Sequence, residues 1–219
     1  RHTKAISPTD KAFVEQSVTA HNWQLVWQSD SDTIDHSHLA MPFYKLEQLN
    51  ITFEFGLSNF IQVNASVNQA MLIQAVKWLA LQGDENVLDL FCGIGNFSLV
   101  LAKQAKTVTG IEGVASAVAL ATQNAHTNSI TNTQFHCFDL TTSIKKAPWF
   151  NKELDVLVLD PSRTGAMAVL EQLPLTQFKA ILYVSCDPVT LARDSAIISQ
   201  AGFELNKIGL MNMFPHTGH

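Results

Sequence analysis

The later part of this sequence alternates short apolar runs of β type with helical stretches, and this alternation restricts the fold more than any other feature. Beyond residue 59, the pattern predicts a helix over residues 70–81. It then predicts six strands, over residues 87–91, 107–111, 133–138, 156–159, 180–185 and 203–211. Strands that alternate with crossover helices form a mostly parallel sheet covered on both faces. We therefore expect an α/β fold with a doubly wound, Rossmann-like sheet.

The first 58 residues follow another pattern, which is typical of a small α/β piece. Ser-Pro-Thr-Asp at residues 7–10 is a helix-capping sequence, and it precedes a predicted helix over residues 11–22. Short strands are predicted over residues 24–27, 43–46 and 51–55. We expect one domain over residues 1–58 and a second over residues 59–219.

Composition narrows the class of protein. A chain of 219 residues that is 47% hydrophobic can bury a sizeable core, and no window resembles a membrane span or a signal peptide. Three widely spaced cysteines argue against disulfides and favour a reducing compartment, the cytoplasm. His36 and His38 lack further ligands at suitable spacing, so we expect no metal site. A net charge of -5 offers no general attraction for nucleic acid.

A glycine loop and two acidic residues follow the first three predicted strands of the later part. Gly93 and Gly95 let the backbone turn tightly and approach a ligand. Glu112 ends the next strand, where a carboxylate can accept hydrogen bonds from the ribose of NAD or of S-adenosylmethionine, or can serve only as a helix cap. Asp139 ends the third strand and has the same two interpretations, adenine contact or helix cap.

The next two strands are followed by a carboxylate and a thiol. Asp160 precedes a proline, which fixes its geometry, and Arg163 can pair with Asp160 or with a phosphate. Cys186 stands before Asp-Pro at residues 187–188, which suits the start of a helix. The positive end of that helix favours a thiolate, so Cys186 is a candidate nucleophile; the alternative is a small buried hydrophobic residue.

An adenosyl cofactor, a carboxylate and a thiolate at one sheet edge suit covalent activation of an electron-poor ring toward a methyl donor. Two other classes stay open at this point. One is an NAD-dependent oxidoreductase, although the loop lacks the third small residue of a dinucleotide fingerprint, with Ser98 in its place. The other is a module that binds the cofactor without turnover.

At these residues the sequence resembles the bacterial 23S rRNA (uracil-C5)-methyltransferases, a class I S-adenosylmethionine-dependent family that also includes the tRNA enzyme making the same modification. The resemblance covers essentially the whole chain. Its motifs lie at residues 59–64, 91–96, 111–113, 160–163, 185–188, 190–194 and 213–219.

The resemblance implies a role for each matching residue. The cofactor site would be lined by Gln62, Phe91, Gly93, Gly95, Asn96, Glu112, Asp139 and Asp160. Gln62 and Asp160 would also lie near the target uracil, and Cys186 would add to its C6 atom. Arg163 is expected to contact substrate, and Arg193 either contacts RNA phosphate or pairs near Asp194.

Three positions depart from the rRNA enzymes: Asp139, Ser162 and Asp187 replace the familiar Asn, Ala and Asn. These departures blur the choice of target, so another 23S rRNA site or a tRNA uridine stays open.

The resemblance also implies what lies outside this chain. An RNA-binding β-barrel and the cysteines of a 4Fe-4S cluster would precede it, and the glutamate base and last strand would follow His219. We therefore expect a C-terminal fragment that binds S-adenosylmethionine, with or without turnover. The expected partner is 23S rRNA, with no membrane and no obligate protein partner.

Overall fold

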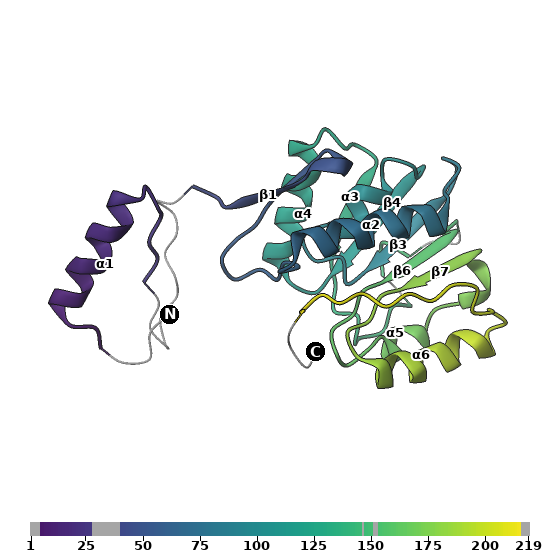
Figure 1. Cartoon of the computed structure of the whole chain (residues 1–219). Helices are drawn as coiled ribbons and strands as arrows, with labels where there is room; N and C mark the ends of the chain where they lie inside the picture. The colour runs from purple at the N-terminus through teal and green to yellow at the C-terminus, as the bar shows by residue number, and fades with distance from the viewer. Residues whose placement is uncertain (1–4, 28–39, 146, 151–152, 216–219) are drawn as a thin grey trace. The chain divides into compact units, whose positions relative to one another are not determined.

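The computed structural model describes residues 5–27, 40–145, 147–150 and 153–215. The chain divides into two compact units, Arg1–Met41 and Pro42–His219 (Figure 1). The domain boundary predicted between residues 58 and 59 stays a prediction. The acidic segment with His36 and His38 lies outside the described residues.

The first unit contains one helix, α1 (Pro8–Ala20), among its described residues. Ser7 caps this helix, since its side chain accepts a hydrogen bond from the Asp10 amide. The predicted helix is present, but it begins at Pro8, three residues before the predicted start, and ends at Ala20, two residues before the predicted end. The strand predicted over residues 24–27 is wrong: this stretch is irregular. A strand exists only through its ladder, and no described strand pairs with this stretch.

The second unit begins with an antiparallel hairpin of β1 (Phe43–Leu46) and β2 (Ile51–Glu54), joined by the 3-10 turn η1 (Glu47–Leu49). Its inward side chains join the main core, where Ile51 and Phe53 are fully buried. Both predicted strands are therefore present, and the hairpin packs as part of this unit.

Two asparagines on α4 (Ala115–Thr127) and at its end hydrogen-bond to the outer edge of β2. Asn124 accepts from the Glu54 amide at 2.8 Å and donates to the Glu54 carbonyl at 3.1 Å. Asn128 does the same with Thr52, at 2.8 Å and 2.7 Å. Side-chain amides thus satisfy backbone groups that a neighbouring strand would otherwise pair, which fixes the hairpin on this helix.

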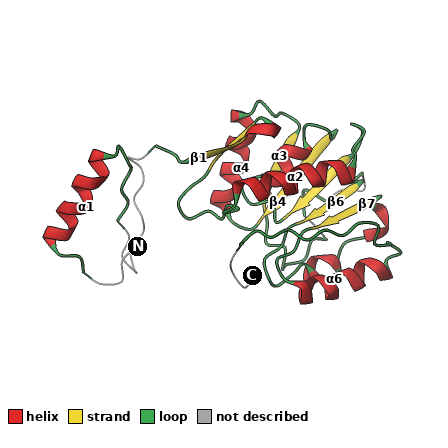
Figure 2. Ribbon diagram, viewed as in Figure 1, coloured by secondary structure: helices red, strands yellow, loops and turns green. Residues whose placement is uncertain are grey.

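The main sheet has five parallel strands in the order β5-β4-β3-β6-β7. Figure 2 shows the strands in yellow. Their bounds are β3 (Asn86–Leu90), β4 (Thr107–Glu112), β5 (Thr133–Cys137), β6 (Val156–Leu159) and β7 (Ala180–Tyr183). The chain runs outward from β3 to β5 and then returns to place β6 on the other side of β3. The predicted doubly wound parallel sheet is confirmed, and the chain order reverses between β3 and β6, where such sheets bind ligands.

Helices cover both faces of this sheet (Figure 1). On one face lie α2 (Ala65–Leu79), α3 (Asn96–Leu101) and α4, and on the other α5 (Met167–Leu170) and α6 (Pro188–Gln200), with the short turn η2 (Leu175–Gln177). Alternate strand residues enter separate cores: Val156 and Val158 join the first, and Leu157 and Leu159 the second. This alternation is the two-residue period of a strand buried on both faces.

The strand predicted over residues 203–211 does not form. Leu205, Ile208 and Leu210 are exposed by 79%, 76% and 99%, and the Lys207 ammonium donates to the Trp78 carbonyl at 3.2 Å. The apolar pattern that suggested a strand is present, but no described strand pairs with this segment. Among the described residues, no helix is long and apolar enough to cross a membrane.

Candidate functional site

The loops that carry the predicted site residues begin side by side at the carboxyl edge of the sheet. The Cys92 amide donates to the Ile111 carbonyl at 3.1 Å, which joins the loops after β3 and β4. The Val184 amide donates to the Leu159 carbonyl at 2.8 Å, which joins those after β6 and β7. The fold therefore brings the glycine loop, Glu112, Asp160 and the Cys186 segment to one edge, as the sequence predicts.

The glycine loop has a strained backbone and an open surface. Phe91, a bulky residue, has a φ of 64°, in the left-handed region that such residues rarely adopt. Gly95 has a φ of 93° and caps α3, and a Cβ atom there would lie 3.3 Å from Leu99. A Cβ atom on Gly93 would meet no described atom within 4 Å, so a ligand can reach the backbone there.

Glu112 is tied to this loop through both carboxylate oxygens. Its Oε2 atom accepts a hydrogen bond from the Gly93 amide at 3.1 Å, and its Oε1 atom accepts one from the Val114 amide at 2.9 Å. A carboxylate held by two amides has a fixed direction, and each oxygen keeps a lone pair for a hydroxyl donor. Its contact with a ribose stays a prediction.

Asn96 is held in place by an asparagine that the sequence did not single out. Asn68 on α2 is 1% exposed, donates to Asn96 Oδ1 at 3.1 Å and accepts from Asn96 Nδ2 at 2.9 Å. Asn64 caps the same helix through the Val67 amide, two residues after the half-buried Gln62. Gln62 and Asn96 thus lie on segments attached to one helix end, and their contacts with a cofactor stay predictions.

Two carboxyl groups near the loop have pKa values displaced toward neutrality. Burial raises the pKa of Asp160 to about 7. Burial likewise raises the pKa of Asp89 to about 7, against the hydrogen bond from Ser98 that lowers it. Asp89 is fully buried, and among the described residues its Oδ1 atom has no hydrogen-bond partner. The sequence signal for Asp89 was a charged residue inside the apolar run of β3.

Asp139 is exposed and stabilises a turn. Its Oδ1 atom accepts from the Thr141 amide at 2.9 Å and from the Thr141 hydroxyl at 2.6 Å. The hydrogen bonds from Thr141 lower the pKa of Asp139. No described helix begins there, so it does not act as a helix cap, and its adenine contact stays a prediction.

Cys186 is exposed and comes directly before the capping residue of α6. The cap is Asp187, whose Oδ1 atom accepts from the Val189 and Thr190 amides, each at 2.9 Å. The amide hydrogen bond from Thr190 comes first among the causes that lower the pKa of Asp187. The thiol is therefore presented at the sheet edge, and its exposure rules out the alternative of a buried packing residue.

The two arginines differ in their surroundings. Arg193 pairs with Asp194, with Nε at 2.8 Å from Oδ1, and its Nη2 atom donates to the Thr164 carbonyl at 2.9 Å. This is the second of its two predicted roles. Arg163 is exposed, and its charge contributes to lowering the pKa of Asp187. Contacts of either arginine with RNA stay predictions.

Comparison with known families decides the kind of protein. Residues 28–219 match the family model described as tRNA (Uracil-5-)-methyltransferase. The chain belongs to this family. Its fold is accordingly the Rossmann-like fold of class I methyltransferases, and the resemblance seen in the sequence is confirmed.

Relatives of this family member include two curated proteins, both called 23S rRNA (uracil(1939)-C(5))-methyltransferase RlmD. The protein from Pseudoalteromonas translucida is 81% identical over 100% of this chain and 50% of its own length. The protein from Shewanella halifaxensis is 44% identical over 100% of this chain and 49% of its own. The chain thus spans about half the length of the curated relatives it matches.

A solved structure supports the fold. The tRNA (uracil-54, C5)-methyltransferase of Pyrococcus abyssi, crystallised with S-adenosyl-L-homocysteine, superposes with a TM-score of 0.72. The match covers 99% of this chain and 52% of that one, at 22% sequence identity.

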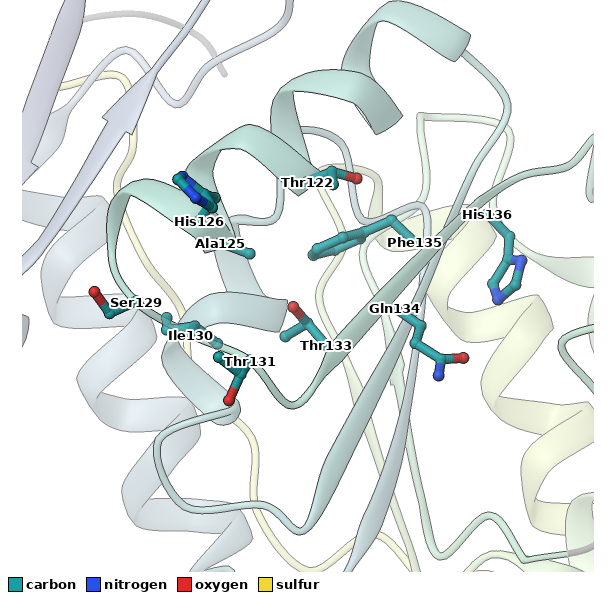
Figure 3. Close-up of a pocket in the computed structure, with 10 residues that line it drawn as sticks. All are labelled: Thr122, Ala125, His126, Ser129, Ile130, Thr131, Thr133, Gln134, Phe135 and His136. Carbon is teal, nitrogen blue, oxygen red and sulfur yellow. The ribbon is translucent and has the colours of Figure 1, made fainter.

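A cavity of about 680 Å³ lies away from this edge, between α4 and β5 (Figure 3). His126 and Phe135 line it from the helix and the strand, and none of the predicted site residues does. Among the described residues, no cluster of three or more His, Cys, Asp or Glu could hold a metal ion.

Proposed function

We propose that this chain carries the catalytic site of an RNA methyltransferase. The reaction is transfer of a methyl group from S-adenosylmethionine to C5 of uridine 1939 in 23S rRNA, as the names of its close relatives indicate. The observation that carries the proposal is the exposed thiol of Cys186 at the same sheet edge as the glycine loop and Asp160. A hydride-transfer enzyme would need no such thiol.

The glycine loop and its neighbours suit an adenosyl cofactor. The open surface over Gly93 admits a ligand to the backbone, and Glu112 presents a fixed carboxylate to ribose hydroxyls. Asn96 offers a positioned amide, and Gln62 and Phe91 complete the lining in this proposal. When bound, S-adenosylmethionine supplies an electrophilic methyl group beside the substrate.

The reaction begins with Cys186. The uridine leaves its base stack so that both faces of the ring become accessible, which costs least in single-stranded or looped RNA. The thiolate adds to C6 and forms a carbon-sulfur bond, and the electron pair of the C5=C6 bond moves toward O4 as an enolate.

Asp160 and Gln62 stabilise this enolate. The Gln62 amide donates a hydrogen bond to O4. A carboxyl with a pKa of about 7 is still protonated in a large fraction of molecules near neutral pH, so Asp160 can donate to the pyrimidine as well. Burial therefore keeps Asp160 able to donate this hydrogen bond near neutral pH.

The final steps restore the aromatic ring. The electron pair of the enolate returns to C5, which attacks the methyl carbon; the bond between that carbon and the sulfonium sulfur breaks, and S-adenosylhomocysteine leaves. A base then takes the C5 proton. The electron pair of the broken C–H bond re-forms C5=C6 and expels Cys186 as a thiolate, so the enzyme is regenerated.

Calorimetry and methyl-transfer assays test this proposal in two stages. The chain is expected to bind S-adenosylhomocysteine in preference to NADH. The chain extended to the length of its relatives is then expected to methylate 23S rRNA, and to leave rRNA with cytidine at position 1939 unmethylated. Tighter binding of NADH would contradict the assignment of S-adenosylmethionine as the cofactor. Methylation of tRNA but not of 23S rRNA would contradict the assignment of 23S rRNA as the substrate.

A further inference from the structure

A buried carboxylate, Asp194 on α6, joins this helix to the loop after β6 and to the end of β7. Its side chain is 0% exposed. Its Oδ2 atom accepts from the Ala166 amide and from the Tyr183 hydroxyl, each at 2.6 Å. Its Oδ1 atom accepts from Arg193 Nε at 2.8 Å and lies 2.7 Å from Nη2. We call Asp194 with these three donors the Asp194 clamp.

The clamp holds the loop that follows Asp160 through hydrogen bonds. Arg193 Nη2 donates to the Thr164 carbonyl at 2.9 Å, and the Gly165 amide donates to the Ser162 carbonyl at 2.9 Å. Gly165 has a φ of 76°, and a Cβ atom there would lie 2.5 Å from both Arg193 Nη2 and Asp194 Oδ2. Only glycine at this position allows the loop to approach Arg193 and Asp194 this closely, so the packing of the loop against the clamp depends on Gly165.

The donors of the clamp suit a carboxylate acceptor. Burial, together with the hydrogen bond to Asp194, raises the pKa of the Tyr183 hydroxyl above its ordinary value. Arginine remains charged in proteins, and an amide does not titrate. Because a buried carboxylate that loses a partner is strongly penalised, the clamp has one low-energy arrangement.

The clamp connects the two reacting groups of the proposed mechanism. Its Ala166 and Thr164 contacts lie on the loop that begins at Asp160, while Tyr183 ends β7 three residues before Cys186. Asp194 itself lies on α6, the helix that begins just after the thiol. Both loops are therefore fixed to a single side chain.

We propose that Asp194 is a positioning residue that sets the placement of Cys186 relative to Asp160; this inference rests on the function proposed above. A displacement of about 1 Å in a reacting group can lower a rate by roughly a hundredfold. Loss of the clamp should therefore slow adduct formation while the binding surfaces for cofactor and RNA persist.

The test is Asp194→Asn in the chain extended to the length of its relatives. The expected result is a fall in kcat of roughly a hundredfold, with the KM for RNA and the affinity for S-adenosylhomocysteine unchanged. Hydrogen exchange of residues 160–166 should become faster, because the Ala166 amide loses its charged acceptor.

Asp155→Asn is the matched control. Asp155 also joins β6 and β7, but at their amino ends, where it accepts from the Asn86 amide at 2.9 Å and pairs with Lys179 at 2.8 Å. This variant should lose stability without the selective fall in kcat. If Asp194→Asn does not fold, Tyr183→Phe removes one donor and keeps the charged pair, with an expected fall in kcat of roughly tenfold.

The outcomes separate the two proposals. No methylation by the unsubstituted protein would overturn the proposed function, whereas hydrogen exchange would still report on the clamp. Methylation that is equally fast with and without the clamp substitutions would overturn the positioning role alone. A rise in KM with kcat unchanged would also contradict it, because that result would make Asp194 a contributor to binding.

Discussion

The two edges of the five-stranded sheet use similar residues for opposite purposes. At the amino edge, Asp155 accepts from the Asn86 amide and pairs with Lys179, and these contacts hold its pKa below the ordinary value. Glu85 accepts from the Gln82 and Gly83 amides in the turn before β3. Both carboxyl groups there are partly exposed and accept hydrogen bonds from backbone amides, which stabilises the fold.

At the carboxyl edge, burial is the first cause that displaces the pKa values of two carboxyl groups. Asp89 and Asp160 both have pKa values raised to about 7, and Phe91 has a left-handed backbone conformation. Such features lower stability and persist where the surrounding structure enforces them. Under the function proposed above, the amino edge of the sheet maintains the fold and the carboxyl edge carries the chemistry.

The strongest test of this contrast removes the thiol. Cys186→Ala should lower methyl transfer by more than about a thousandfold, because the proposed covalent intermediate forms on this thiol. Cys137→Ala is the matched control, since Cys137 is also exposed but ends β5, a different strand. Labelled methyl groups in RNA measure both. Equal activity in the two variants would show that the exposed thiol at this edge has no catalytic role.

The next largest effect concerns stability. The pKa of Asp89 is higher in the folded chain than in the unfolded chain, so the folded state is relatively more stable while this carboxyl is protonated. This relative stability is lost as rising pH ionises the carboxyl. The free energy of unfolding should therefore fall between the ordinary pKa of 3.8 and the folded value of about 7. Asp89→Asn mimics the protonated state and should be more stable by on the order of 2 to 4 kcal/mol at about pH 8.

Urea unfolding at several pH values measures this difference. Ser98→Ala serves as the opposite change, because it removes the donor at Oδ2 and should lower stability at every pH. Were Asp89→Asn less stable than the unsubstituted chain at alkaline pH, burial would not be what displaces this pKa.

A third experiment addresses Asp160 through the pH profile of kcat. If the protonated carboxyl donates to the pyrimidine, kcat should decline as pH rises through about 7, since the ionised form cannot donate. Asp160→Asn keeps a donor but cannot ionise, so this decline should disappear while kcat falls by roughly tenfold to a hundredfold. Asp155→Asn, at the other edge, should retain the decline. A decline that persists in Asp160→Asn would assign it to another group.

The smallest expected effect is on cofactor affinity, which should depend on a glutamate at the carboxyl edge of the sheet but not on one at the amino edge. Glu112→Gln should weaken binding of S-adenosylhomocysteine by roughly tenfold, because the amide loses charge toward the ribose hydroxyls. Glu85→Gln makes the same substitution in a residue that also accepts two backbone amides, but at the amino edge. Calorimetry should find its affinity unchanged. Similar losses in both variants would indicate a general effect on the fold.

Much of the sheet and its edge could be predicted because both arise from local patterns. Apolar runs located β3 to β7 to within about two residues, and the residues that follow them reach one edge in any parallel sheet. The same reasoning failed for residues 24–27 and 203–211, because an apolar pattern does not specify a hydrogen-bonding partner.

Contacts between distant side chains could not be predicted in this way. Asn68 meets Asn96 across 28 residues, and Asp194 meets the Ala166 amide across 28 residues as well. Only the folded chain brings such groups together, although a polar residue within an apolar helical face would be a weak signal. Arg193 illustrates the point, because its two predicted roles differed only in which neighbour it meets.

The central claim is that Cys186 is the nucleophile at the carboxyl edge. Its most direct test is to mix the extended protein and S-adenosylmethionine with 23S rRNA containing 5-fluorouridine, whose fluorine cannot leave as a proton would. Mass spectrometry of the digested protein should find the nucleotide attached to the peptide that contains Cys186. Attachment to Cys137, or methylated RNA with no attached peptide, would contradict the account.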